Sequence, residues 1–152
     1  MSVCLELSVD NDEELLRQAA EDGHVPAMHA FGLQCDRQDE RQRWLREAAH
    51  EGYVLAMYDY GLNCGNPKQK RYWLRMAAQG GHIQAMYLLG QEFHDSAERE
   101  RWLRMAAEEG HVPAMYELGL TCVDLKEKRR WLEEAARNGS QKAMEELAEV
   151  GY

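Results

Sequence analysis

The chain has 152 residues, of which 45% are hydrophobic and 30% charged, and its formal net charge is −9. This acidity disfavours nucleic-acid binding, which needs a basic surface to neutralise phosphates. It favours a basic protein partner, although acidity also simply keeps a protein soluble. No apolar run reaches the ~20 residues of a membrane span, and Met1–Asp10 does not resemble a secretory signal. We therefore expect a cytoplasmic protein that binds neither nucleic acid nor membrane.

One segment, Trp-Leu-x-x-Ala-Ala-x-x-Gly, recurs along the chain at a fixed spacing. Its four clear copies begin at Trp44, Trp73, Trp102 and Trp131. The differences 73 − 44, 102 − 73 and 131 − 102 are all 29. A less regular copy runs from Leu15 to Gly23, with leucine in place of tryptophan. A constant period of this length is typical of a solenoid, in which helical hairpins stack on their neighbours.

Each repeat is predicted to contain two helices, which we name helix A and helix B. Helix A is expected to begin after a capping residue such as Asn66 or Asp124, with Gln69 or Glu127 three residues later, the spacing of a capping box. Equivalent capping positions are held by Asp95 and Ser8. The recurrent segment then gives helix A an apolar face at helical period. Its last residue, glycine, is expected to close the helix.

Helix B is expected to begin near Pro26 and Pro113, because proline suits the first helical turn. Only a few residues separate each helix B from the next helix A, which leaves no linker for a domain boundary. We therefore predict a single repeat domain over residues 1–152, with repeats at about 8–36, 37–65, 66–94, 95–123 and 124–152.

Three recurring residue types are predicted to be structural. The tryptophans lie on the apolar face of helix A and are expected to form the core, as are the methionines Met28, Met57, Met86, Met115 and Met144. Three cysteines recur near the end of helix B, at Cys35, Cys64 and Cys122. Equivalent positions on stacked helices lie ~8–10 Å apart, too far for a disulfide. We expect reduced thiols there.

Three histidines, His24, His82 and His111, each follow the closing glycine of a helix A. Each belongs to a different repeat, so no two of them are expected to share a metal ion, and a turn or capping role is the better interpretation. The sequence contains no Cys-x-x-Cys pair, phosphate-binding loop or nucleophilic serine elbow. We predict no metal, no cofactor and no enzymatic activity.

The recurrent pattern closely resembles the Sel-one-like repeat family, which is related to tetratricopeptide repeats. The resemblance rests on the tryptophan segment followed by Ala-Met-x-x-Leu-Gly and covers about Val9 to Val150. Its clearest copy contains Trp102, Leu103, Ala106, Ala107, Gly110, Ala114, Met115, Leu118 and Gly119. The chain departs from the family in having only a few residues where a glycine-rich loop usually follows helix B. The resemblance implies an all-α, right-handed α/α superhelical solenoid whose concave face, lined by helix A, binds proteins.

Two sets of residues are candidates for partner binding. One lies on the polar side of helix A and contains Arg43, Arg46, Tyr72, Arg75, Arg101 and Arg104. Guanidinium groups there could clamp carboxylates of an acidic peptide, or the face could be solvated and balanced by pairs such as Arg43 with Glu47 and Arg104 with Glu108. The other set is on helix B: Tyr58, Tyr87 and Tyr116. These tyrosines could contact a partner or pack on the neighbouring repeat.

The predicted function is a non-catalytic protein–protein interaction module, an adaptor or scaffold that binds another protein through helix A. The partner could be a signalling or assembly component. The alternative is a stoichiometric inhibitor, such as a cytoplasmic bacterial immunity protein that neutralises a basic toxin. The family resemblance is compatible with both uses.

Overall fold

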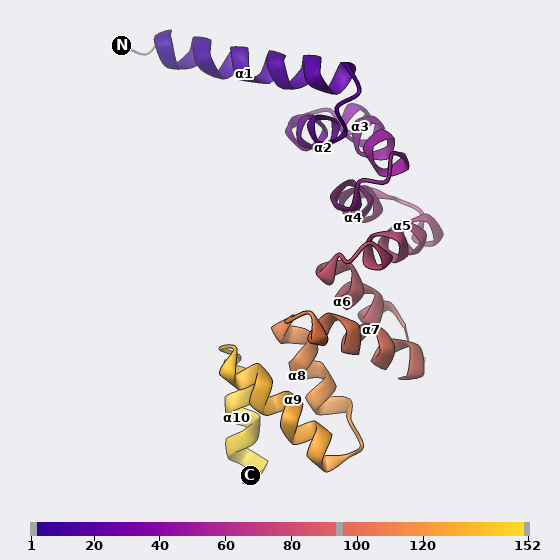
Figure 1. Cartoon of the computed structure of the whole chain (residues 1–152), viewed down its shortest axis with the longest axis vertical. Coiled ribbons are helices and arrows are strands. Elements are labelled where there is room, and N and C mark those ends of the chain that lie inside the picture. The colour runs from indigo at the N-terminus through magenta and orange to yellow at the C-terminus, as the bar shows by residue number, and fades with distance from the viewer. Residues whose placement is uncertain (1–2, 94–95, 151–152) are drawn as a thin grey trace. The chain divides into compact units, whose positions relative to one another are not determined.

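The structure is a computed structural model that describes residues 3–93 and 96–150, with side chains described over 12–93 and 97–149. Every regular element in these residues is an α-helix (Figure 1), which confirms the predicted all-α fold class. The helices are α1 (Val3–Glu21), α2 (Val25–Gln34), α3 (Gln38–His50), α4 (Val54–Asn63), α5 (Pro67–Gln79), α6 (Ile83–Glu92), α7 (Ser96–Glu108), α8 (Val112–Thr121), α9 (Leu125–Arg137) and α10 (Gln141–Val150). One compact unit spans Met1–Gly81 and a second spans His82–Tyr152.

Helix bounds follow the sequence period. The helices α3, α5, α7 and α9 begin at residues 38, 67, 96 and 125, so each start lies 29 residues after the one before. The predicted start of the first helix A after Ser8 is wrong, because α1 already begins at Val3. Residues 3–7 contain neither proline nor glycine, so nothing in them stops a helix from extending. The predicted cap Asp95 lies outside the described residues.

The capping residues of helix A act in two ways. Asp124 accepts a hydrogen bond from the backbone N–H of Glu127 at 2.8 Å, as a capping box requires. Asn66 accepts instead from the N–H of Lys68 at 2.9 Å. Both residues satisfy a donor of the first helical turn that would otherwise have no partner.

Between helix A and helix B, the chain turns on a glycine and a capping residue. The glycines have φ between +87° and +91°, a region that other residues rarely adopt: Gly23, Gly52, Gly81, Gly110 and Gly139. Three histidines that follow accept the N–H three residues later through Nδ1: His24 and His82 at 3.2 Å, and His111 at 3.3 Å. The predicted capping role of these histidines is confirmed.

His111 gives the stability of the protein a dependence on pH. Its Nδ1 accepts from Ala114, and its Nε2 lies 3.0 Å from Oε1 of Gln84, where it donates in the neutral tautomer. Burial lowers its pKa, against a smaller opposing effect of Glu117. The unfolded chain, with a histidine pKa near 6.5, therefore binds the proton more readily. This stabilisation is complete above about pH 6.5 and is lost as the pH falls through the folded pKa.

We expect His111→Ala to lower the free energy of unfolding by about 1 kcal/mol at neutral pH, because it removes a helix cap. His111→Asn should retain the cap, since asparagine is a favourable N-cap residue, and should lose less stability on acidification than the wild type. Urea titrations at about pH 7.5 and about pH 5, on either side of the unfolded pKa, measure both effects. Equal acid sensitivity of wild type and His111→Asn would contradict this role.

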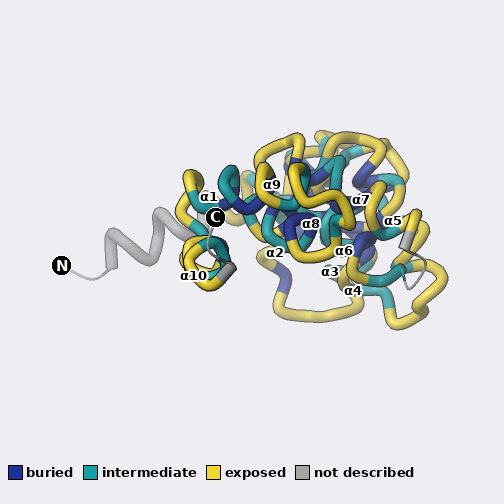
Figure 2. Tube along the Cα trace, turned by 90° about the horizontal axis from the view of Figure 1, so that it is seen from below, coloured by how far each residue is buried: buried dark blue, intermediate teal, exposed yellow. Residues whose placement is uncertain are grey.

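Buried residues recur in each hairpin, and the stretches of chain that they occupy are dark blue in Figure 2. The four tryptophans are only 3–8% exposed, which confirms their predicted core position: Trp44, Trp73, Trp102 and Trp131. The leucine that follows each of them has no exposed surface: Leu45, Leu74, Leu103 and Leu132. Among the methionines, Met57, Met86 and Met115 are buried. The core prediction is wrong for Met144, which is 44% exposed. No helix within the described residues follows α10 to cover it.

The three recurring cysteines are free thiols at the C-caps of α2, α4 and α8. Burial raises the pKa of each of them, so the thiol form predominates at neutral pH.

Considering only the residues that the structure describes, none of the helices has both the length and the apolar character needed to cross a membrane.

Candidate protein-binding site

Two of the predicted partner-binding residues, Arg46 and Tyr72, line the same hollow in the first unit. This basic hollow has a volume of about 420 Å³ and is formed by side chains of α3, α4 and α5. Its lining consists of Arg46, His50, Tyr60, Lys68, Gln69, Tyr72 and Trp73. The described lining contains two cations and no carboxylate, in a chain whose net charge is −9.

An aromatic cluster forms one wall of the basic hollow. The rings of His50, Tyr60 and Tyr72 each meet Trp73 edge to face, with centroids 5.0, 5.5 and 5.2 Å away. This is a favourable geometry for aromatic pairs. Trp73 itself is only 8% exposed, but Tyr72 is 57% exposed. The core tryptophan therefore supports an aromatic side chain that a partner can reach.

The cations of the basic hollow lack internal partners. Arg46 and Lys68 are both exposed, and neither side chain has an ion pair or a hydrogen bond to any residue that the structure describes. An exposed guanidinium without a partner can form two parallel hydrogen bonds with an incoming carboxylate.

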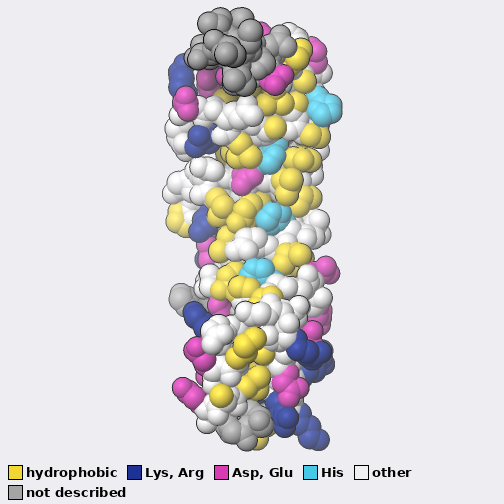
Figure 3. Space-filling model, turned by 90° about the vertical axis from the view of Figure 1, so that its left-hand side faces the viewer, with side chains coloured by type: hydrophobic (Ala, Val, Ile, Leu, Met, Phe, Trp, Pro, Cys, Tyr) yellow, Lys and Arg dark blue, Asp and Glu magenta, His cyan; other side chains and the backbone are white. Residues whose placement is uncertain are grey.

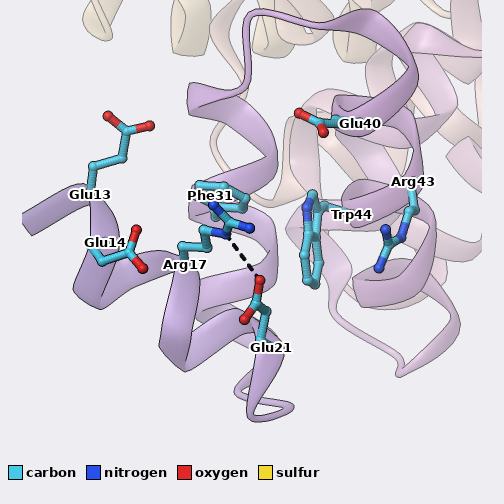
Figure 4. A pocket seen from close by; sticks show the side chains of 8 residues that line it. All are labelled: Glu13, Glu14, Arg17, Glu21, Phe31, Glu40, Arg43 and Trp44. Atoms are coloured by element: carbon cyan, nitrogen blue, oxygen red, sulfur yellow. Dashed lines mark hydrogen bonds and ion pairs between the residues drawn. The ribbon is translucent and has the colours of Figure 1, made fainter. Parts of the chain in front are cut away.

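A second hollow occupies the same place one repeat earlier (Figure 4), with the opposite charge. This acidic hollow has a volume of about 410 Å³, and its lining is Glu13, Glu14, Arg17, Glu21, Phe31, Glu40, Arg43 and Trp44. Subtracting 29 from Arg46, Tyr60 and Trp73 gives Arg17, Phe31 and Trp44. Both arginines here have partners: Arg17 pairs with Glu21 at 3.0 Å, and Arg43 pairs with Glu47 at 3.2 Å.

Arginines that precede a tryptophan in the sequence lie against its ring. The guanidinium carbon of Arg43 is 5.0 Å from the Trp44 ring centroid, and that of Arg101 is 5.9 Å from the Trp102 centroid. Contacts of this kind contribute ~0.5–1 kcal/mol at exposed sites. The predicted residues Arg43 and Arg101 thus also have an internal role, as covers for core tryptophans.

In the second unit, Arg104 lies between two carboxylates. It donates to Glu100 at 2.7 Å and to Glu127 of α9. The predicted pairing with Glu108 is wrong. Glu100 and Glu108 are each four residues from Arg104, one helical turn away on opposite sides, and Arg104 pairs with Glu100 and with Glu127 instead. These bonds raise the pKa of Arg104 and lower that of Glu127. Arg75, at the equivalent position of α5, is exposed and also interacts within the chain.

Among the predicted tyrosines, Tyr87 packs on the neighbouring hairpin. Its hydroxyl donates to Oε1 of Glu117 at 2.7 Å, and its ring centroid lies 4.5 Å from that of His111. Burial and Glu117 together raise its pKa to about 12. The equivalent pair in the first unit is His29 with Asp59, at 2.6 Å. These contacts favour the packing alternative at Tyr87.

Tyr116 is partly buried and, together with Tyr87, lines a third hollow of about 290 Å³ between α6, α8 and α10. Tyr58 of α4 is also partly buried, and burial raises its pKa. The left-hand side of Figure 1, turned towards the viewer in Figure 3, shows many hydrophobic side chains together with histidines.

Residues of the basic hollow that sequence reasoning missed are Tyr60, Lys68 and Gln69. Tyr60 had a signal: its equivalents at the 29-residue spacing are Phe31, Leu89, Leu118 and Leu147. Leu89 and Leu118 have no exposed surface, whereas Leu147 and the two aromatic residues are partly buried. The aromatic copies are those that line hollows.

No protein-family model and none of the curated proteins matches the chain. Among solved structures, it is similar to a protective antigen of uropathogenic Escherichia coli strains that displays an SLR fold, with a TM-score of 0.82 and 28% identity over 89% of this chain and 35% of that one. It is also similar to a Sel1 repeat protein from Oxalobacter formigenes, with a TM-score of 0.78 and 22% identity over 91% of this chain and 68% of that one. The chain thus spans about a third of the length of the first protein.

Proposed function

We propose that this chain, which has the fold of the Sel-one-like repeat family, is a non-catalytic adaptor that binds a partner protein through the helix A side of its first unit. Solenoids of helical hairpins offer extended surfaces on which partners bind. The resemblance to solved repeat proteins supports a protein-interaction module.

The observation that carries this proposal is the composition of the basic hollow. Tyr72 is 57% exposed on a buried tryptophan, beside an arginine that no described residue pairs. Tyrosine and arginine are among the residue types that most often dominate binding energy in interfaces. Covering them with a partner removes aromatic surface from water and gives Arg46 a hydrogen-bond acceptor. Both changes favour association.

A second candidate function, inhibition of a basic protein such as a toxin, is supported by the acidic hollow. Four glutamates line it around Phe31 and Trp44. A lysine or arginine side chain of a partner would find both carboxylates and aromatic rings there. In this case the binding surface would centre on α1 and α3, and loss of the basic hollow would leave binding intact.

Affinity capture from the source lysate distinguishes the two candidates. We expect wild type to capture one protein, and the Arg46→Ala, Tyr72→Ala double variant to capture at least about tenfold less of it, which corresponds to 1.4 kcal/mol. The control is Arg37→Ala, which removes a positive charge at a 70% exposed side chain outside the hollow. Equal capture by all three proteins would refute the proposed site. A protein lost only in Glu14→Gln, Glu40→Gln would support the inhibitor.

A further inference from the structure

We propose that the basic hollow binds a partner carboxylate that lies next to an aromatic ring, as on adjacent acidic and aromatic residues of a peptide segment. This inference rests on the proposed function, and names the chemistry that the site recognises. The second unit already contains an internal version of the carboxylate contact.

The internal version is the environment of Arg104. Its guanidinium binds Glu100, one turn earlier in α7, and Glu127, in the first turn of α9. Hydrogen bonding to Arg104 is the largest cause of the lowered pKa of Glu127, so this position holds an ionised carboxylate. In the second unit, carboxylates of the chain itself therefore bind this arginine.

For Arg46, both of the equivalent positions hold neutral amides. Subtracting 58, two repeats, from Arg104, Glu100 and Glu127 gives Arg46, Gln42 and Gln69. Gln42 is engaged elsewhere, because its amide donates to the backbone carbonyl of Asn63 at 3.1 Å. Gln69 lines the hollow as a neutral side chain. Arg46 thus has the position of Arg104 without its two internal ligands.

Other copies of this arginine retain at least one acid near it. Arg17 pairs with Glu21 at 3.0 Å, and Glu40 lines the same hollow. Next to Arg75, the positions of Gln42 and Gln69 hold Arg71 and Glu98. Only the Arg46 copy therefore has neutral residues at both positions. A carboxylate from outside would meet two cations there, whereas at Arg17 it would meet glutamates.

The aromatic part of the ligand follows from two further replacements. The position of Tyr60 is held in the second unit by Leu118, which has no exposed surface, and the position of Tyr72 is held by Arg130. The basic hollow therefore has two aromatic rings beside Trp73 at positions that hold a buried leucine and a cation two repeats later. A ligand ring can pack against these rings in offset or edge-to-face geometry. A volume of about 420 Å³ accommodates a ring together with its neighbouring carboxylate.

The test uses the blocked peptide acetyl-Gly-Glu-Phe-Gly-amide, with acetyl-Gly-Gln-Phe-Gly-amide as its neutral isostere. Titration into the isotope-labelled full chain is followed by nuclear magnetic resonance. We expect saturable shifts at the amides of Arg46, Gln69 and Tyr72, with a Kd on the order of 1 mM, and at least about tenfold weaker binding of the neutral peptide. Equal binding of both peptides, or no saturable shift, would overturn the proposal.

Two substitutions make the test specific to the repeat comparison. Gln69→Glu should supply Arg46 with an internal carboxylate, as Glu127 does for Arg104, and should weaken peptide binding at least about tenfold. Gln38→Glu, which adds the same charge at an exposed residue outside the hollow, should leave peptide binding within about twofold of wild type. Unchanged binding to Gln69→Glu would contradict the inference. Urea titration of both variants establishes that they remain folded.

Failure of this inference can be told apart from failure of the proposed function. If the lysate partner depends on Arg46 and Tyr72 but the Glu-Phe peptide does not bind, the site stands and the ligand chemistry is wrong. If the peptide binds but capture of the partner is unaffected by the double variant, the hollow recognises the chemistry and the partner binds elsewhere.

Discussion

Replacing Trp44 by alanine is expected to lower the free energy of unfolding by about 3–5 kcal/mol, the usual cost of removing a buried aromatic side chain and leaving a cavity. Trp44 is 7% exposed and belongs to a buried cluster with Ala20, Ala27 and Cys35. Its ring also meets Phe31 edge to face, with centroids 5.7 Å apart. Urea titration followed by far-ultraviolet circular dichroism measures the loss without relying on tryptophan fluorescence.

The matched control is Leu15→Ala, at the position one repeat before Trp44. Leu15 is 61% exposed, so its truncation should change stability by less than about 0.5 kcal/mol. The comparison separates burial from repeat position, because both residues occupy the same place in helix A. A loss below about 1 kcal/mol for Trp44→Ala would show that the tryptophan is not a core residue.

Replacing Gly119 by leucine is expected to cost about 3 kcal/mol, at the upper end of the usual range for overpacking. Gly119 is buried in α8, against Leu132 of α9. A Cβ at this glycine would lie 2.7 Å from both Cγ and Cδ2 of Leu132 and 3.3 Å from its backbone nitrogen. The first carbon of the new side chain therefore already clashes, before the rest of leucine is placed.

Gly65→Leu makes the same chemical change in open space, since no atom lies within 4 Å of a Cβ there. It should alter stability by no more than about 0.5 kcal/mol. Equal unfolding midpoints in urea for the two variants would mean that α8 and α9 separate readily, against the close contact between Gly119 and Leu132.

Much of the fold could be predicted because its determinants are local and recur. Each tryptophan, with the leucine and alanines that follow it at helical spacing, identified the buried face of helix A, and the glycine–histidine sequence identified the turn and the helix B cap. The errors occurred in the first and last helices, α1 and α10. Ser8 resembles a cap but lies inside α1, and Met144 resembles a core residue but is 44% exposed.

The candidate site was less predictable because it depends on contacts between repeats. Helical spacing alone offered Glu108 as the partner of Arg104, whereas Glu127, 23 residues away, binds it across two helices. The basic hollow likewise combines Arg46 of α3 with Tyr60 of α4 and Lys68 of α5. Predicting which residues lie together in such a site requires knowing which helix faces are in contact. The neutral residues Gln42 and Gln69, at the positions of Glu100 and Glu127, could nevertheless be found by comparing copies of the repeat.

The turn glycines also bear on how such repeats diverge. A residue with a side chain is strained at a φ near +90° even where space is open, as it is around Gly23. A core tryptophan can be exchanged once its surroundings change: the first copy has Leu15 where the other four have tryptophan, yet it has the turn glycine, Gly23. As duplicated repeats diverge, substitutions would then accumulate at the aromatic positions before the glycines. In distant descendants, glycines 29 residues apart would be the most durable trace of common ancestry.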